Sequence, residues 1–380
     1  MKNFSCDIFC RVVDNYGDIG VCWRLARQLA NEFDVSVRLW VDDLKRLAML
    51  CPEVDAASTI QRCRGVEVRL WDEAFPGVQP ANLVVETFSC MLPEPYLAAM
   101  DASQVWINLE YLSAEDWVEG CHKLPSPRPP LTRHFFFPGF TQKTGGLILE
   151  RGLFARRDAF VKDTVQQRAF WQLINLDVPS ADTLKISLFA YENAALEELL
   201  DAWANGGQRM LCLVPQGRIL PQVASYFGKK NDRYVRGNLQ VAVLPFVEQE
   251  KYDELLWACD VNFVRGEDSF VRAQWSGKAF VWQIYPQHDE VHWQKLDAFL
   301  NLYGRQLSGQ VRKSVERFWK AWNGKGAVKE AWEEFAGARY ELAGCGKDWA
   351  AELSQNNLAL NLLDFFQELG TMRAFKIEGQ

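Results

Sequence analysis

The feature that most constrains the fold of this chain is an alternation of strand-like and helix-like segments that occurs twice. In the first series, the apolar run 6–13 precedes a segment in which Val21, Leu25 and Leu29 share one helical face, and short runs rich in β-forming residues follow. The second series begins at Leu184 and continues to the run KAFVWQIY. Such alternation is typical of parallel sheets covered by helices.

The length of 380 residues exceeds the size at which single hydrophobic cores stop growing, about 250–300 residues, so two domains are expected. We predict doubly wound, Rossmann-like α/β domains over 1–155 and 180–350, with a helix at about 355–372 packing back on the first. The proline-rich stretch 123–134 is expected to interrupt the alternation, and residues 135–180 to form an excursion and a linker. Because open α/β sheets bind ligands at the carboxyl ends of their strands, both domains should face one cleft.

Composition limits the partners and the setting. A net charge of −7 makes general attraction to nucleic acid or to an acidic membrane surface unexpected. No apolar run approaches the roughly 20 residues needed to span a bilayer, and the start MKNFSCD lacks the features of a signal peptide, so a cytoplasmic location is expected.

Metal and disulfide sites are not indicated by the cysteine and histidine spacing. The ten cysteines include no CxxC pair, and several lie in apolar runs where a reduced thiol behaves as a small hydrophobe. His288 and His292 are four residues apart on a predicted helix, but no third ligand is near them in the sequence. We therefore assign these histidines to the surface or to packing.

The turn DNYGDIG places two carboxylates, Asp14 and Asp18, between the first strand and its helix. In a doubly wound domain this turn lies at the carboxyl end of the strand, where a carboxylate can act as a general base or hold a cation. The alternative is that both side chains merely accept hydrogen bonds from backbone N–H groups of the turn.

The same turn also matches a degraded dinucleotide fingerprint. Gly17 and Gly20 fill two of its three glycine positions, and Asp42 or Asp43 follows at a suitable distance for a ribose contact. Against this interpretation, the carboxylate of Asp18 would oppose the attraction of a helix start for a pyrophosphate.

A second informative stretch, 263–287, has the order strand, acidic turn, helix, strand. The first strand ends at Arg265, and the turn contains Glu267, Asp268 and Ser269. A helix start offers unbonded N–H groups to a diphosphate, and Arg265 and Ser269 could add donors. The alternative is an ordinary N-cap at Asp268 or Ser269 with a surface pair of Arg265 and Glu267.

Aromatic residues follow two other predicted strands. Phe189 and Tyr191 end the first strand of the second series, and Phe246, Gln249 and Tyr252 follow a later one. Aromatic stacking with a few amide contacts is a usual way to hold a nucleobase. Core packing is the alternative for Phe246 and Tyr252.

Together these stretches resemble one family, the bacterial EarP rhamnosyltransferases that modify an arginine of translation elongation factor P (EF-P). The resemblance spans essentially the whole chain and is carried by VVDNYGDIGVCWRLARQL, WINLEYLSAEDW, FFFPGFT, SLFAYEN and RGEDSFVRAQWSGKAFVWQIYPQ. It implies a GT-B glycosyltransferase that transfers L-rhamnose from dTDP-β-L-rhamnose with inversion, activating EF-P for the rescue of stalled ribosomes. It implies no metal or other cofactor.

The resemblance also implies roles for residues. Asp18 takes the position of the general base with Asp14 as its partner, and Glu267 is a further catalytic residue. An arginine is always protonated in water, so paired carboxylates suit it as an acceptor. The residues implied to bind the donor are Tyr16, Gly17, Phe189, Tyr191, Phe246, Gln249, Tyr252, Arg265, Asp268 and Ser269. The acceptor surface is expected around Glu110 and Tyr111.

Two other functions remain open at this point. One is a GT-B transferase with a different nucleotide sugar or protein acceptor, and the other is a non-catalytic protein that binds nucleotide sugars. An Asp18→Asn variant separates an enzyme from a non-catalytic protein, because an enzyme should lose transfer while keeping its affinity for dTDP, and a loss of dTDP binding would indicate a structural role.

Overall fold

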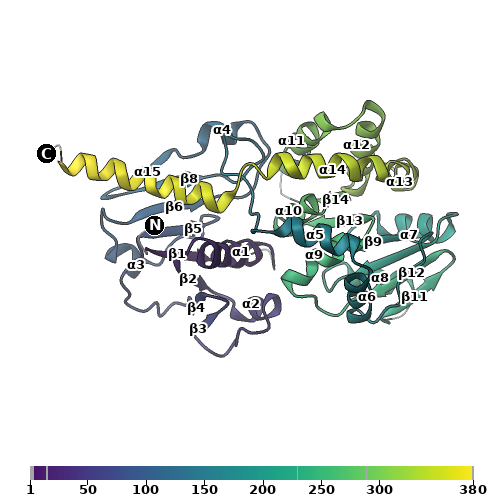
Figure 1. Ribbon diagram of the computed structural model, residues 1–380, viewed down its shortest axis with the longest axis horizontal. Helices are drawn as coiled ribbons and strands as arrows, with labels where there is room; N and C mark the ends of the chain where they lie inside the picture. Colours follow the sequence, from purple (N-terminus) through teal and green to yellow (C-terminus); the bar gives the residue numbers. More distant parts are fainter. Residues whose placement is uncertain (1–3, 14–15, 229, 287–289, 379–380) are drawn as a thin grey trace. The chain divides into compact units, whose positions relative to one another are not determined.

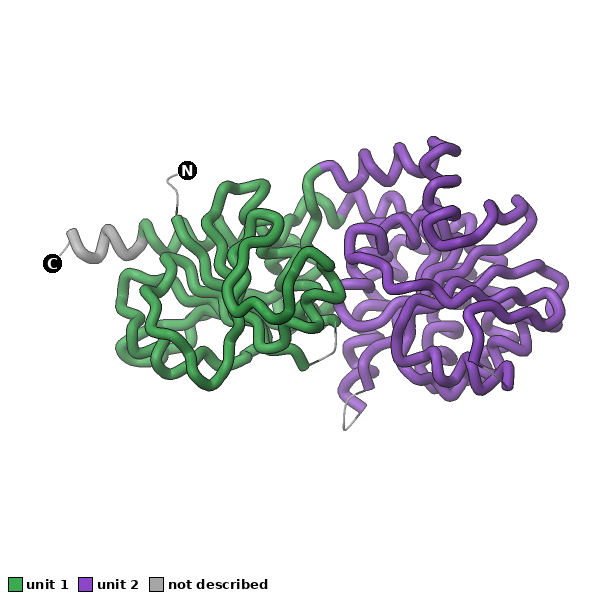
Figure 2. Tube along the Cα trace, turned by 90° about the horizontal axis from the view of Figure 1, so that it is seen from below, with its two compact units in different colours: residues 1–151, 353–380 green, residues 152–352 purple. Residues whose placement is uncertain are grey.

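The computed structural model describes residues 4–13, 16–228, 230–286 and 290–378 (Figure 1). The chain divides into two compact units, residues 1–151 with 353–380 (unit 1) and residues 152–352 (unit 2) (Figure 2). Each unit contains one largely parallel sheet with helices, so the predicted α/β class is confirmed. Within the described part of the chain, no helix is both long and apolar enough to span a membrane.

Unit 1 contains an eight-stranded sheet with the order β3-β4-β2-β1-β5-β6-β8-β7. The two edge strands, β3 and β7, are antiparallel to their neighbours, and the other strands are parallel. The strands are β1 (Ser5–Cys10), β2 (Ser36–Val41), β3 (Ile60–Cys63), β4 (Val66–Leu70), β5 (Leu83–Thr87), β6 (Val105–Leu109), β7 (Pro125–Arg128) and β8 (Leu131–Phe136).

The sheet of unit 1 has a different core on each face. Along β1, Cys6 and Ile8 belong to a cluster with residues of α1 and α15, whereas Phe9 packs with Trp40 and other aromatic residues of a second cluster. This is the period-two alternation of a strand buried on both faces. The helices of this unit are α1 (Gly17–Glu32), α2 (Leu44–Leu50), α3 (Glu94–Ala99), α4 (Trp117–Cys121) and α15 (Leu358–Glu378), and α15 runs along β6 (Figure 1).

The proline-rich stretch continues the sheet, and the prediction that it interrupts the alternation is wrong. β7 and β8 form an antiparallel hairpin in register from Pro125 opposite His134 to Arg128 opposite Leu131. The turn between them contains a cis bond at Pro129–Pro130. Proline is tolerated here because β7 is an edge strand, whose outer side needs no N–H donors.

A buried carboxylate joins several elements of unit 1. Asp7 is fully buried and accepts hydrogen bonds from Arg38 Nε and Nη2, both at 2.6 Å, and from Trp40 Nε1 at 3.2 Å. The Tyr96 hydroxyl and the Ala81 N–H also donate to it. Burial, together with the Asp7 charge, raises the pKa of Tyr96 well above its usual range and so keeps the hydroxyl protonated beside Asp7.

We expect Asp7→Ala to lower the free energy of unfolding by about 3–5 kcal/mol, because removing one partner of a buried ion pair leaves the other charge uncompensated. The Arg38 side chain keeps 20% exposure, which favours the lower end of that range. Urea denaturation measures the change. Glu73→Ala, on the exposed surface of the same unit, is the control and should stay within about 0.5 kcal/mol. A loss below about 1 kcal/mol for Asp7→Ala, the value of a surface pair, would contradict this role.

Unit 2 contains a six-stranded sheet with the order β11-β12-β10-β9-β13-β14, of which the edge strand β11 is antiparallel. The strands are β9 (Leu184–Leu188), β10 (Met210–Val214), β11 (Arg233–Arg236), β12 (Leu239–Val243), β13 (Val261–Arg265) and β14 (Ala279–Gln283). The helices are α5 (Leu153–Lys162), α6 (Thr164–Leu173), α7 (Leu196–Asn205), α8 (Leu220–Tyr226), α9 (Gln249–Ala258), α10 (Asp268–Ser276), α11 (Val291–Tyr303), α12 (Gly309–Trp322), α13 (Val328–Gly337) and α14 (Arg339–Leu353), with a short 3-10 turn η2 (Gly304–Gln306).

Part of the predicted linker is built into unit 2. Residues 153–173 form α5 and α6, and Phe160 contacts Phe170 and Trp257 of α9 with ring centroids 6.0 and 5.7 Å apart. The linker interpretation is therefore wrong for these residues. Charged and polar side chains dominate the segment, but its few aromatic rings provide enough buried contact to fix both helices.

The strand order of each sheet defines where a ligand can bind. In unit 2 the chain runs from β9 outward through β10 and β12, and later returns to the other side of β9 as β13 and β14. In unit 1 the same reversal lies between β1 and β5. Open α/β sheets bind ligands at the carboxyl ends of the strands beside such a switch point. The two candidate sites are therefore the edge at β9 and β13 and the edge at β1 and β5.

Candidate functional site

The switch point of unit 2 holds an arginine against two aromatic rings. Leu188 of β9 lies opposite Phe263 of β13, so the residues that follow both strands come together. The guanidinium carbon of Arg265 lies 4.6 Å from the ring centroid of Phe189 and 4.4 Å from that of Tyr191. Arg265 is only 5% exposed. A permanent positive charge is therefore presented at a strand end beside stacking surfaces, which suits an anionic ligand with an aromatic group.

The turn after β13 is held by its own side chains. Gly266 has a φ of 61°, the left-handed conformation that favours glycine, and Trp282 Nε1 donates to its carbonyl oxygen at 3.0 Å. The Ser269 hydroxyl accepts from Arg265 N at 3.1 Å and donates to the Arg265 carbonyl. Ser269 therefore fixes the turn that carries Arg265.

The ordinary-cap interpretation of this turn is wrong in two respects. The N-cap residue of α10 is Glu267, and its side chain makes no capping hydrogen bond. Arg265 is buried and does not lie at the surface. The first turn of α10 thus begins directly beside a buried cation, as expected for a diphosphate site.

Residues at the start of α9 join this cluster. Gln249 Nε2 donates to Asp268 Oδ2 at 3.1 Å, and the Tyr252 ring lies edge-on to Phe189 with centroids 5.8 Å apart. Burial raises the pKa of Tyr252 well above its usual range, and the charge of Asp268 adds to the shift. Phe246 is half-buried in the loop that joins β12 to α9, at the same edge of the sheet.

Two residues that sequence reasoning missed position this cluster. Arg272 of α10 and Asp253 of α9 form a buried bidentate ion pair, with Nε–Oδ1 at 2.7 Å and Nη2–Oδ2 at 2.6 Å. Arg272 lies one helical turn after Asp268, the first residue of α10, and Asp253 lies one turn after Gln249, the first residue of α9. The pair therefore fixes the two helix starts relative to each other. Arg272 belongs to the stretch RGEDSFVRAQWSGKAFVWQIYPQ that carries the family resemblance, but nothing in the local pattern identifies its partner.

In unit 1, Asp18 lies in the first turn of α1, at the switch point between β1 and β5. It is 3% exposed, and its Oδ2 accepts a hydrogen bond from Val13 N at 2.8 Å. The N-cap residue Tyr16 makes no side-chain capping bond, and Tyr16 and Gly17 are half-buried at this turn. Asp18 therefore has the backbone contact that the structural interpretation predicts, and this contact orients its carboxylate. Asp14 and His288 lie outside the described residues.

The dinucleotide interpretation requires Asp42 or Asp43 for a ribose contact, but both carboxylates bind backbone N–H groups. Asp42 Oδ1 accepts from Val12 N at 2.9 Å, and Asp43 caps α2 by accepting from Arg46 N at 3.1 Å. Both carboxylates thus serve turns of unit 1.

The carboxyl end of β5 has an unusual backbone conformation that the sequence did not predict. Phe88 and Ser89 both have a φ of 54°, although neither is glycine, and such conformations cluster at functional sites. Phe88 stacks on Tyr111 with ring centroids 4.4 Å apart, and Tyr111 is 40% exposed. Burial raises the pKa of the neighbouring Glu110 carboxyl. These residues lie where the sequence predicts the acceptor surface.

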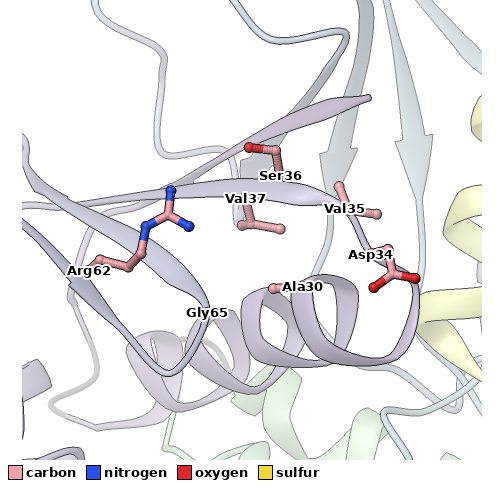
Figure 3. Close-up of a pocket in the computed structure, with 7 residues that line it drawn as sticks. All are labelled: Ala30, Asp34, Val35, Ser36, Val37, Arg62 and Gly65. Atoms are coloured by element: carbon pink, nitrogen blue, oxygen red, sulfur yellow. The ribbon is translucent and has the colours of Figure 1, made fainter. Parts of the chain in front are cut away.

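A surface pocket of about 450 Å³ lies at the other edge of the unit 1 sheet (Figure 3). It is lined by residues at the amino ends of β2 and β4, including Ser36 and Gly65, and by Arg62 of the antiparallel strand β3. Because catalytic ligands of doubly wound folds bind at the carboxyl ends, we do not assign this pocket to the reaction.

The architecture of two Rossmann-like units, each with a site at its switch point, is that of the GT-B glycosyltransferases. The structure of CalG4, the calicheamicin glycosyltransferase, matches 97% of this chain and 98% of its own with a TM-score of 0.51 and 12% identity. At this identity the match shows the fold alone.

Closer matches identify the family. The family model described as Elongation-Factor P (EF-P) rhamnosyltransferase EarP matches residues 6–367. The protein-arginine rhamnosyltransferase of Pseudomonas putida is 50% identical over 371 residues, which cover 95% of this chain and 98% of that protein. A structure described as "Structural basis for EarP-mediated arginine glycosylation of translation elongation factor EF-P" matches with a TM-score of 0.71 and 37% identity, covering 96% and 99% of the two chains. The chain belongs to the EarP family and is a glycosyltransferase, which confirms the resemblance.

Proposed function

We propose that this enzyme transfers L-rhamnose from dTDP-β-L-rhamnose to an arginine side chain of EF-P in the cytoplasm, with inversion at the anomeric carbon. Neither nucleic acid nor a membrane takes part. The observation that carries the donor side is the Arg265 guanidinium between Phe189 and Tyr191 at the switch point of unit 2. The acceptor side is supported by the relatives, which are protein-arginine rhamnosyltransferases, and by the matching family, whose description names EF-P.

On the donor side, the thymine base stacks against the aromatic residues of unit 2 and the diphosphate meets Arg265 and the first N–H groups of α10. When the bond between the sugar and the diphosphate breaks, negative charge develops on the leaving dTDP. Arg265 and the start of α10 stabilise this charge, so the reaction requires no metal. We assign Glu267, the N-cap residue of α10, a role beside the diphosphate, because it lies in unit 2 with the donor-binding residues.

On the acceptor side, Asp18 acts as the general base. A guanidinium nitrogen is a poor nucleophile while protonated, and a carboxylate that binds it can localise its charge and accept the proton as the C–N bond forms. The nitrogen attacks the anomeric carbon from the face opposite dTDP, which gives an α-linked rhamnose. Asp14 remains the predicted partner of Asp18.

Incubation of purified EF-P with the enzyme and dTDP-β-L-rhamnose, followed by intact-mass analysis, tests the proposal. We expect one deoxyhexose on one arginine-containing peptide, with an α-anomeric signal by NMR. If no mass is added although calorimetry detects dTDP binding, the GT-B transferase with another sugar or acceptor replaces this proposal. If added mass appears only on other proteins, the acceptor is wrong.

The Phe189→Ala variant tests the nucleotide pocket. Because base stacking contributes about 1–3 kcal/mol per base, we expect the Kd for dTDP to rise roughly 5–150-fold. Isothermal titration calorimetry measures the change. The control is Phe227→Ala, which removes a ring of another stacked pair in unit 2, with Tyr234 at 4.5 Å, and should leave the Kd unchanged. Equal Kd values for wild type and Phe189→Ala would place the base elsewhere.

A further inference from the structure

Three potential metal ligands gather in unit 1, away from the strand ends that carry the reaction. The sulfur atoms of Cys51 and Cys63 lie 3.3 Å apart, and the Cys63 sulfur lies 3.6 Å from Glu53 Oε2. All three donor atoms lie within 4.8 Å of one another. Both cysteines are buried, whereas the Glu53 side chain is 57% exposed. The thiol side of the group is therefore shielded from water, and the carboxylate side is open to it.

The backbone fixes both cysteines. Cys51 ends α2, with its N–H donating to the Leu47 carbonyl at 2.9 Å. Cys63 is the last residue of β3, and the turn to β4 consists of Arg64 and Gly65 with φ of 45° and 85°. This is the tight two-residue hairpin turn in which both central residues are left-handed. The two thiols are therefore held by regular elements, whereas Glu53 lies in the turn that follows α2.

The two oxygens of Glu53 have different contacts. Oε1 accepts from Arg64 Nε at 3.0 Å and from Nη2 at 2.8 Å, whereas Oε2 is directed at the Cys63 sulfur. Carboxylates that bind metals are commonly oriented in this way, by a hydrogen bond to the oxygen that does not coordinate. A metal at Oε2 leaves the contact with Arg64 intact.

One of the two measured distances between the ligand atoms matches a tetrahedral zinc ion, and the other is close to it. With Zn–S of about 2.3 Å and Zn–O of about 2.1 Å, tetrahedral angles put a sulfur and an oxygen ligand about 3.6 Å apart and two sulfurs about 3.8 Å apart. The observed S–O distance is 3.6 Å. The observed S–S distance of 3.3 Å is shorter by about half an ångström, which small rotations of the two thiol side chains supply.

We propose that Cys51, Cys63 and Glu53 bind one Zn²⁺ ion, with water as the fourth ligand. Two thiolates select a soft or borderline ion over Mg²⁺ or Ca²⁺, and the carboxylate suits a divalent one. On binding, both thiols lose their protons to water and form the two Zn–S bonds. The ion fastens the β3–β4 hairpin to the end of α2 and takes no part in sugar transfer. The competing interpretation is that the thiols are only small hydrophobic side chains.

To test the proposal, the full chain is stripped of metal with a chelator, kept reduced and titrated with zinc. A chromogenic zinc indicator that competes with the protein for zinc reports the binding. We expect one Zn²⁺ per chain, a rise in Tm, and a thiolate-to-metal charge-transfer band when Co²⁺ replaces zinc. Cys63→Ser should abolish the site, and Glu53→Gln should weaken it measurably, because a neutral amide is a poorer zinc ligand than a carboxylate. Because Glu53 is largely exposed, that variant tests the site without disturbing the core.

Cys121→Ser provides the control, since Cys121 is a partly exposed cysteine of the same unit outside the cluster. It should bind zinc like the wild type, and stripping zinc should not change the rate of transfer. The proposal is overturned if wild type shows no saturable zinc binding, or if Glu53→Gln and Cys63→Ser both bind like wild type. A Cys51–Cys63 disulfide in protein that binds no zinc after reduction would also overturn it.

Discussion

The Asp18→Asn variant should transfer rhamnose to EF-P about 10²–10⁴-fold more slowly than the wild type, the range that a general base contributes. Asparagine keeps an oxygen that can accept the Val13 N–H bond, observed at 2.8 Å, so the start of α1 should remain folded. What is lost is the negative charge and the capacity to take a proton from the acceptor guanidinium. Single-turnover kinetics with saturating dTDP-β-L-rhamnose measure the rate of this step.

Two controls separate catalysis from structure in this variant. The Kd for dTDP and the Tm should equal those of the wild type, because Asp18 belongs to unit 1 and the residues assigned to the base and the diphosphate belong to unit 2. Asp18→Ala, which also removes the acceptor for Val13 N–H, should lower the Tm as well as the rate. If Asp18→Asn transfers rhamnose within a few-fold of wild type, another group accepts the proton. If it loses dTDP binding, the carboxylate has a structural role.

Replacing Arg265 by methionine should reduce kcat/KM for the donor about 10²–10³-fold, the loss found when one donor to a developing negative charge is removed. Methionine retains a long apolar side chain between Phe189 and Tyr191, so packing is largely preserved while the charge disappears. Arg265→Lys should recover only part of the rate, because an ammonium cannot stack on the rings as a planar guanidinium does. Steady-state kinetics with varied donor concentration give kcat and the KM for the donor.

The matched control for Arg265 is Arg236→Ala. Arg236 also lies over a tyrosine, with its guanidinium carbon 4.7 Å from the Tyr226 ring centroid, but it belongs to the antiparallel edge strand and is exposed. Its loss should leave donor kinetics unchanged. A wild-type kcat/KM for Arg265→Met would show that the diphosphate does not meet this arginine.

The chain's local patterns were enough to predict the α/β class and part of the strands of each sheet. Apolar runs such as LKISL and VNFVR form buried strands, because periodicity and β propensity act between near neighbours. The same local logic failed at β7 and β8. There the prolines suggested a break, and only the position of β7 at the sheet edge makes them acceptable.

The candidate donor residues were predicted individually, but their assembly could not be. Phe189, Gln249 and Arg265 are separated in the sequence: Phe189 follows β9, Gln249 begins α9 and Arg265 ends β13. They meet because β9 and β13 are adjacent in the sheet and because the Asp253–Arg272 ion pair holds α9 beside α10. Strand order is set by long-range pairing and packing, which no short window of sequence encodes.

The sequence alone therefore identifies the side chains available to the chemistry. They are the carboxylates of an acidic turn before the first helix, aromatic residues after a strand, and an arginine before an acidic helix start. Which of them share a site is a property of the folded sheets. The hydrogen bond from Val12 N to Asp42, and the contact of Cys51 with Cys63, arise in the same way. These contacts join elements whose neighbourhood is created by burying apolar surface, which is a cooperative property of the whole unit.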